Sequence, residues 1–227
     1  MAPEAFVATV SRPHLAYACT WLSKFNQVPT KRARRLLDGA LRYAHATAKT
    51  SITLKRPGKD FYLSAHVDAS FASATEIYPQ SGFIVMAEGV PVMWKSCKQK
   101  RVCRSTLRAE TAAMDMVVDE LSYNQPFFDL FWPNLKIEIA TDANDLVALL
   151  KQIHPRPVER SLTHVIKKLQ DKLTVVALYA LSDSLHEGKY VVYHIATERN
   201  RADPLSKPMA VDNIYQLLSP KKQLASI

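Results

Sequence analysis

Four acidic residues lie at the edges of expected strands and helices, and together they suggest metal chemistry. Asp68 follows the alternating apolar and polar run at 63–67, and Asp142 follows a similar run at 135–140. Glu110 and Asp203 lie near the starts of expected helices. Four carboxylates brought together repel one another and are stable as anions mainly around bound cations. The pattern predicts a site for two divalent ions, as in nucleases that hydrolyse phosphodiesters.

Two of these acids also have a purely local explanation. The positive end of a helix favours a carboxylate in its first turn, where we expect Glu110. Asp203 precedes Pro204, and this pair is a common helix start in which the aspartate caps the first turn. The metal hypothesis therefore requires that the four side chains meet in space.

The net charge of +9 arises from 30 Lys and Arg against 21 Asp and Glu. A generally basic surface would explain the excess of positive charge. However, the basic residues are clustered in the sequence, which favours a partner with a phosphate backbone. The clusters are Lys31, Arg32, Arg34 and Arg35; Lys95, Lys98, Lys100, Arg101, Arg104 and Arg108; and Arg199, Arg201 and Lys207.

Several classes of protein are disfavoured by composition. Only five glycines occur, and the sequence contains neither of the glycine-rich motifs that bind phosphate, G-x-x-x-x-G-K and G-x-G-x-x-G. Three cysteines without a C-x-x-C pair argue against a disulfide framework or zinc site, so we expect a reducing compartment, the cytoplasm or nucleus. An acid-poor N-terminus makes a mitochondrial location a weaker alternative. No apolar run has transmembrane length, so no membrane partner is expected.

The elements that would position the acids can be read in chain order. We expect helices within 12–47, broken at 26–29, with Thr30 capping the second and Leu36 and Leu41 in its buried stripe; Pro3 and Pro13 should interrupt any earlier helix. Expected strands are 61–67, 82–87, 90–95, 135–140 and 190–195, and a basic loop spans 96–104. Expected helices begin near Ser105 and cover 143–151, 162–169, 173–185 and 211–218, although 174–179 could be a strand.

This order, with its local motifs, resembles the ribonuclease H domain of copia-type LTR retrotransposon polyproteins. Residues 68–72 are similar to the family's D-A-D-W-A, residues 94–99 to W-x-S-K-K-Q, residues 105–111 to S-S-T-E-A-E-Y, and residues 202–208 to A-D-x-L-T-K-P. Upstream, residues 11–18 resemble the R-P-D-I-A-Y-A segment near the end of the family's reverse transcriptase. The family's K-H-I-D-I stretch has no clean counterpart, with His164 the nearest candidate, and Ala143 replaces the Asn or Gln that usually follows the third acid.

The resemblance implies an α/β ribonuclease H-like fold, with a mixed five-stranded sheet flanked by helices and preceded by a small helical segment. It implies a helical reverse-transcriptase thumb or connection remnant at 1–58, a ribonuclease H-like domain at 59–209 and a C-terminal tail at 210–227. The paired-aspartate polymerase motif is absent, so the chain is not a complete reverse transcriptase. A polymerase domain or a larger polyprotein is the implied protein partner.

The implied activity is Mg²⁺-dependent hydrolysis of the RNA strand of RNA–DNA hybrids. Asp68 would bridge two magnesium ions, which Mn²⁺ could replace; Glu110 and Asp142 would complete one site and Asp203 the other. Contacts to the nucleic acid are expected from Lys95, Ser96, Lys98, Arg101, Ser105, Thr106 and Asn144. The alternative is a catalytically inactive, domesticated ribonuclease H-like domain that binds nucleic acid or protein.

Overall fold

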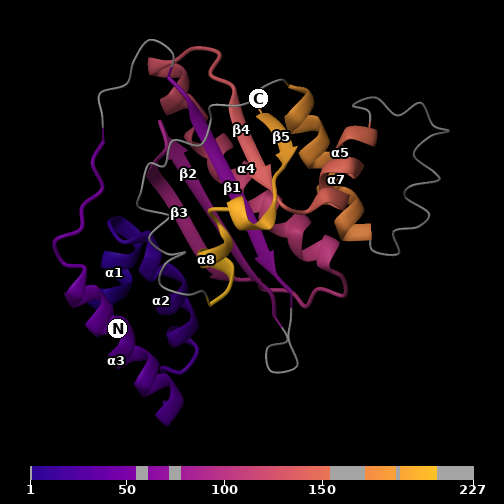
Figure 1. The fold of residues 1–227 in the computed structure, drawn as a ribbon. Coiled ribbons are helices and arrows are strands. Elements are labelled where there is room, and N and C mark those ends of the chain that lie inside the picture. The colour runs from indigo at the N-terminus through magenta and orange to yellow at the C-terminus, as the bar shows by residue number, and fades with distance from the viewer. Residues whose placement is uncertain (1, 55–60, 72–77, 154–171, 188–189, 209–227) are drawn as a thin grey trace.

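A five-stranded sheet forms the centre of the computed structural model, which describes residues 2–54, 61–71, 78–153, 172–187 and 190–208 (Figure 1). The strands are β1 (Leu63–Ser70), β2 (Gln80–Ala87), β3 (Val90–Lys98), β4 (Ile137–Thr141) and β5 (Tyr190–His194). Their order across the sheet is β3-β2-β1-β4-β5. The first three strands in the chain form an antiparallel meander, whereas β4 and β5 join β1 in parallel.

Local sequence explains how the meander turns. Glu88 and Gly89 connect β2 to β3 and both have positive φ angles, 51° and 78°. A two-residue turn of this kind matches the twist of the strands it joins and favours glycine. The parallel pairing of β1 with β4 requires a crossover instead, and the long helix α4 (Thr106–Phe131) supplies it.

One face of the sheet is covered by α4, α5 (Asn144–Gln152) and α7 (Lys172–His186). Alternate residues of β1 and β2 point to this face, and Leu63, Val67 and Val85 pack there against Met114 and Leu121 of α4. Ser105 caps α4 by accepting a hydrogen bond from the backbone N–H of Arg108. The main core is therefore sandwiched between the sheet and these helices.

The opposite face carries the N-terminal helices and the short helix α8 (Asp203–Ser206). The N-terminal elements are α1 (Ala2–Val10), the 3-10 turn η1 (Pro13–Leu15), α2 (Ala16–Ser23) and α3 (Lys31–Ala46); a second 3-10 turn, η2 (Thr197–Arg199), precedes α8. Ala16 and Leu205 pack on Ile84 and Met86 of β2. The N-terminal segment is thus in contact with the sheet.

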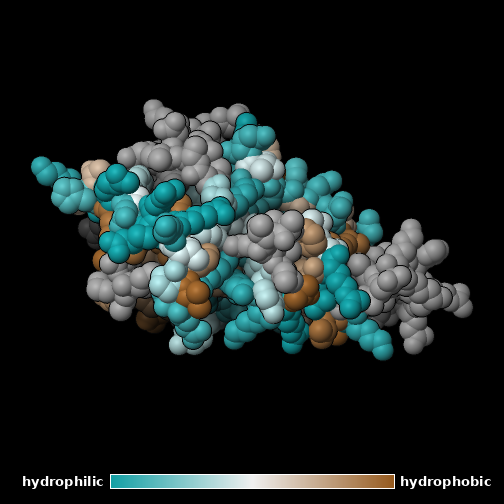
Figure 2. Space-filling view, turned by 90° about the horizontal axis from the view of Figure 1, so that it is seen from below, coloured by the Kyte–Doolittle hydropathy of each residue, from teal (hydrophilic) through white to brown (hydrophobic). Residues whose placement is uncertain are grey.

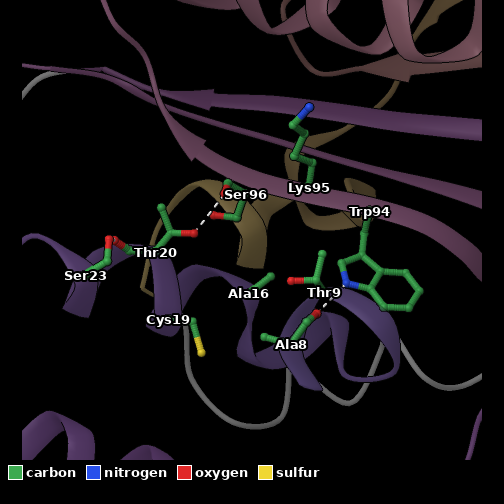
Figure 3. Close-up of a pocket in the computed structure, with 9 residues that line it drawn as sticks. All are labelled: Ala8, Thr9, Ala16, Cys19, Thr20, Ser23, Trp94, Lys95 and Ser96. Atoms are coloured by element: carbon green, nitrogen blue, oxygen red, sulfur yellow. Dashed lines mark hydrogen bonds between the residues drawn. The ribbon is translucent and has the colours of Figure 1, made fainter. Parts of the chain in front are cut away.

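Two hydrogen bonds fasten the N-terminal helices to β3 (Figure 3). The Trp94 indole donates to the carbonyl of Ala8 at 2.7 Å, and the Thr20 hydroxyl donates to the carbonyl of Ser96 at 2.8 Å. A cavity of about 260 Å³ lies between α1, α2 and β3 at this junction. None of the helices in the described ranges has both the length and the apolarity to span a bilayer.

The expected five strands, the Thr30 cap, the helix after Ser105 and the helix at 173–185 are confirmed, so residues 174–179 do not form the alternative strand. Three expectations are wrong. Helix α1 forms despite Pro3, which is tolerated in a first turn. Strand β3 continues through Lys98, into the expected loop. Leu36 and Leu41 of α3 are 46% and 42% exposed, and of that helix only Ala33 is buried.

Other expectations lie outside the described residues. These are the helices at 162–169 and 211–218, the position of His164, and the tail at 210–227. The division into units at 1–58, 59–209 and 210–227 stays a proposal.

Candidate metal centre

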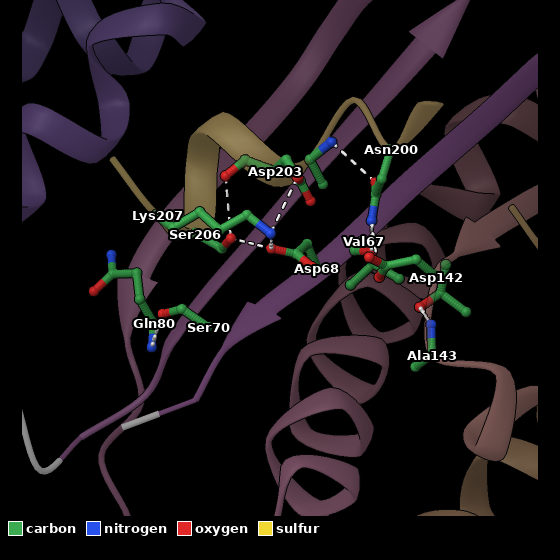
Figure 4. Close-up of polar contacts among 12 residues, drawn as sticks. Val67, Asp68, Ser70, Gln80, Asp142, Ala143, Asn200, Asp203, Ser206 and Lys207 are labelled. Carbon is green, nitrogen blue, oxygen red and sulfur yellow. Dashed lines mark hydrogen bonds and ion pairs between the residues drawn. The ribbon is translucent and has the colours of Figure 1, made fainter. Parts of the chain in front are cut away.

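Three carboxylates from distant parts of the chain meet beside β1 (Figure 4). Asp68 lies within β1, Asp142 directly follows β4, and Asp203 is the first residue of α8. One oxygen of each lies within 4.8 Å of the others. Because β1 and β4 are parallel neighbours, their carboxyl ends share one edge, which is where α/β sheets commonly place their sites.

Glu110 is not one of these three mutually close carboxylates, but the charges of Asp68 and Asp142 act on it. Its expected first-turn position is wrong. Helix α4 begins at Thr106, its first turn contains no acid, and Glu110 falls in the second turn. Attraction to the helix end therefore does not account for its position. Burial, followed by the charges of Asp68 and Asp142, raises the pKa of Glu110 to about 9, and the backbone amide of Ala69 acts in the opposite direction.

The pKa values of Asp68 and Asp203 are shifted in the same direction. Burial is the main cause that raises the pKa of Asp68 to about 6; Asp203 and Asp142 contribute, while Ser206 and Lys207 oppose the shift. Burial also raises the pKa of Asp203. Without a bound cation, these groups hold their protons more tightly than free carboxyls do.

The donor set fits a hard divalent cation such as Mg²⁺, which prefers carboxylate oxygens. Two oxygens strengthen this fit: Oε2 of Glu110 and Oδ1 of Asp203 are enclosed and have no hydrogen-bond partner. A buried acceptor without a partner is costly, and an ion would satisfy both. Asp68, Asp142 and Asp203 could therefore hold metal.

Lys207 and Ser206 contact two of the acids (Figure 4). The Lys207 ammonium lies 3.0 Å from Oδ2 of Asp203 and 3.9 Å from Oδ2 of Asp68. The Ser206 hydroxyl donates to the same oxygen of Asp68. Although burial opposes it, the negative charges of Asp68 and Asp203 raise the pKa of Lys207.

Asn200 connects strand β1 to Asp142 by hydrogen bonds. Its buried amide nitrogen donates to the carbonyl of Val67 at 2.9 Å and to Oδ1 of Asp142 at 3.3 Å, while its amide oxygen accepts from the backbone N–H of Ala202. Asn200 thereby fixes Asp142 relative to β1 and sets the start of α8.

The residues expected to contact nucleic acid are mostly on the surface, but one points inward. Lys98 lies over the ring of Tyr78, and Lys95 pairs with Glu120 at 3.2 Å. Arg101, Ser105, Thr106 and Asn144 are exposed. Ser96 is buried: its hydroxyl donates to the carbonyl of Leu205 at 2.5 Å and accepts from the amide of Gln80. We therefore leave Ser96 out of the proposed contacts and assign it to holding α8.

The sequence pattern indicated no role for Asn200, Ser206 or Gly82, and it indicated Lys207 only as part of a basic cluster that suits phosphate. Ser206 and Lys207 lie inside the motif at 202–208, so their spacing from Asp203 was an available signal. Asn200 and Gly82 act through contacts with remote segments, which no local pattern shows.

The sheet order, the mixed strand directions and the flanking helices define the ribonuclease H-like α/β fold. Its acidic cluster lies where strands β1 and β4 end.

Homologues of the chain are retrovirus-related Pol polyproteins encoded by transposons. It is 27% identical over 203 residues to the Pol polyprotein of transposon RE2 from Arabidopsis thaliana, and this match covers 88% of the chain. The chain spans about 13% of the length of the curated relatives it matches first. No protein-family model matches the sequence.

A solved structure with low sequence identity supports the likeness in fold. The foamy viral protease-reverse transcriptase dRH, solved in complex with double-stranded DNA, matches 86% of this chain and 31% of its own, with 12% identity and a TM-score of 0.52. LC11-RNase H1, isolated from compost by a metagenomic approach, matches 70% of this chain and 99% of its own, with 19% identity and a TM-score of 0.44.

Proposed function

We propose that the chain is a two-metal endonuclease of the ribonuclease H type, which hydrolyses the RNA strand of RNA–DNA hybrids. One observation carries the proposal: Asp68, Asp142 and Asp203 converge from distant segments, and the charges of Asp68 and Asp142 act on Glu110. Packing alone does not explain this convergence, because clustered buried carboxylates destabilise a fold that holds no cation.

In the proposed site, Asp68 would help to hold two Mg²⁺ ions, for which Mn²⁺ could substitute. Glu110 and Asp142 would hold one of them with Asp68, and Asp203 would hold the other with Asp68. Bound ions of this kind activate water at neutral pH and stabilise the charge on the leaving oxygen. Asn200 keeps the Asp142 carboxylate turned toward Asp68, and Ser206 orients Asp68 by hydrogen bonding.

The excess of basic residues in the chain suits a polyanionic partner. Seen from below, the described surface is mostly hydrophilic, with apolar residues in small separate groups (Figure 2). Lys95, Lys98 and Arg101 would contact phosphates, while Ser105, Thr106 and Asn144 would contact sugars or phosphates. Hybrid would be distinguished from DNA by duplex shape and 2′-hydroxyl groups, not by base identity.

The protein partner in this proposal is a polymerase domain or the rest of a larger polyprotein. The homology to transposon Pol polyproteins supports it, since the chain matches only a small part of their length. In the same proposal, residues 1–58 are the helical remnant of a reverse transcriptase that grips duplex.

A labelled RNA–DNA hybrid tests the activity. Wild-type protein should cleave the RNA strand with Mg²⁺ and not with EDTA. Asp68→Asn and Asp142→Asn should each lower the rate by more than about 100-fold, since even partners of metal ligands cost 10–100-fold. Asp145→Asn, an exposed acid just beyond Asp142, is the matched control and should retain activity. Cleavage by both site variants at the wild-type rate would refute the metal assignment.

A second function, binding of nucleic acid or protein without cleavage, is favoured by one observation. The Lys207 ammonium already offsets part of the charge on Asp68 and Asp203. An inactive module would bind the hybrid equally well with EDTA and with Mg²⁺, would cleave it under neither condition, and would show no Mn²⁺ binding by calorimetry.

A further inference from the structure

Lys207 is placed to act as a cation tethered to the acidic cluster. Its backbone N–H donates to the carbonyl of Asp203 at 3.2 Å, closing the single turn of α8. This turn brings the side chain back over Asp203, and its ammonium reaches both Asp203 and Asp68 (Figure 4). The ammonium therefore lies between the acids from β1 and α8.

The environment makes this contact more than a surface ion pair. The side chains of Asp68 and Asp203 are 3% and 6% exposed, so water screens their charges poorly. Exposed pairs contribute little, whereas a cation beside two buried carboxylates offsets a repulsion that the fold would otherwise retain. Lys207 thus stabilises the cluster when no metal is bound.

Lys207 forms ion pairs with only two of the four acids. Among the described residues, ion pairs join Lys207 to Asp68 and Asp203 but not to Glu110 or Asp142. The ammonium occupies one side of the cluster, where Oδ2 of Asp68 also accepts from Ser206. Lys207 acts on Glu110 and Asp142 only through charge at longer range, without an ion pair.

We propose that Lys207 competes with the second divalent ion, so that the two metal positions have unequal affinity and the ion between Asp68 and Asp203 binds only when the lysine is displaced. This inference rests on the proposed function. An ammonium and a divalent cation repel each other at short range in a poorly screened site, so both cannot keep the same oxygens. The Lys207 side chain is 37% exposed and flexible, so it can swing into solvent.

Mn²⁺ titration of the full chain by calorimetry tests the proposal. Wild-type protein should bind two ions, the second at least tenfold more weakly than the first. Lys207→Met should tighten the second site by at least about tenfold and leave the first within a factor of about three. Lys207→Arg keeps the charge and should keep the wild-type difference. Lys136→Met is the matched control: it removes the same charge at the opposite end of β4 from Asp142 and should change neither affinity.

Thermal unfolding supplies a readout independent of activity. In EDTA, Lys207→Met should melt at a lower temperature than wild-type protein, and saturating Mn²⁺ should close or reverse the difference. If Lys207→Met binds two ions with wild-type affinities, the competition is refuted and the nuclease proposal stands. If neither protein binds Mn²⁺, the nuclease proposal itself fails, and the competition with it.

Discussion

Gly82 of β2 lies directly against Leu205 of α8. A Cβ atom added to Gly82 would stand 2.6 Å from the Cβ of Leu205 and 2.7 Å from its carbonyl carbon. Gly82 is also the residue that pairs with Asp68 across β1 and β2. The missing side chain thus lets α8 approach the sheet closely enough to bring Asp203 to Asp68.

Gly82→Ala should displace α8 and weaken the site. The added methyl group meets backbone atoms, so the free energy of unfolding should fall by about 1–3 kcal/mol, as is typical of overpacking. Mn²⁺ affinity should fall with it. Gly39→Ala is the control: nothing lies within 4 Å of the added atom on α3, and alanine favours a helix by up to about 1 kcal/mol. Unchanged stability and metal binding in Gly82→Ala would contradict the close approach.

Asn200→Ala should lower metal affinity about 10–100-fold, the usual cost of losing a residue that orients a ligand. Asp142 would lose its amide donor, and the carbonyl of Val67 would lose a partner. Asn200→Asp keeps the shape but replaces a donor with a negative charge beside Asp142, so it should not rescue the site. Calorimetry with Mn²⁺ measures both variants, and wild-type affinity in Asn200→Ala would exclude a positioning role.

Metal-free protein should become less stable as the pH rises above the ordinary range of a glutamate. The pKa of Glu110 is about 9 in the folded protein and 4.5 as its ordinary value, so the folded state holds a proton that the unfolded state has released. The stabilisation is complete below pH 4.5 and is lost as the pH rises through about 9, with a slope of up to about 1.4 kcal/mol per pH unit from this group. Urea unfolding in EDTA at pH 6 and pH 8 should show a steeper loss for wild type than for Glu110→Gln. Equal slopes would show that Glu110 is not buried among charges.

Acid should destabilise the N-terminal packing through His14. Burial, and then the charge of Arg12, lowers the pKa of His14 to about 4, below its ordinary 6.5. The folded state therefore resists protonation, and stability is lost as the pH falls from 6.5 through about 4. His14→Phe keeps an aromatic ring against Tyr43 and should reduce the loss between pH 7 and pH 5. His45→Phe, at an exposed position on α3, should not.

His66 should account for part of the remaining acid sensitivity, because burial and then Arg201 lower its pKa to about 3. If His14→Phe and wild-type protein lose equal stability on acidification, His14 is not enclosed by the helices.

The strands and the four acids could be predicted from sequence because both depend on local pattern. Alternation in 63–67 and 135–140 follows from strands with two different faces, and Asp68 and Asp142 adjoin these strands, whereas Glu110 and Asp203 lie in helices. Contacts between remote segments leave no comparable pattern. The exposure of Leu36 shows this on α3: helical spacing predicts which residues share a face, but not whether another element covers it.

In the candidate site, too, local patterns could be predicted from sequence, whereas contacts between remote segments could not. That Asp203 belongs to the cluster followed from a motif, but its distance from Asp68 depends on Gly82, Ser96 and Asn200, whose partners lie far along the chain. Ser96 shows how residue type misleads: a serine between two lysines suggests a backbone contact, yet its hydroxyl is used inside the protein.

Ser96 is also the point through which the first helices reach α8. Its carbonyl accepts from Thr20 and its hydroxyl donates to Leu205. A recombinant fragment starting at residue 59 would lack Thr20 and the helices that cover Ile84 and Trp94. Its β2 and β3 strands would therefore expose a hydrophobic surface to solvent. A protein truncated at that boundary would therefore tend to aggregate and would hold α8 less firmly. A negative nuclease assay on the fragment would say nothing about the intact chain.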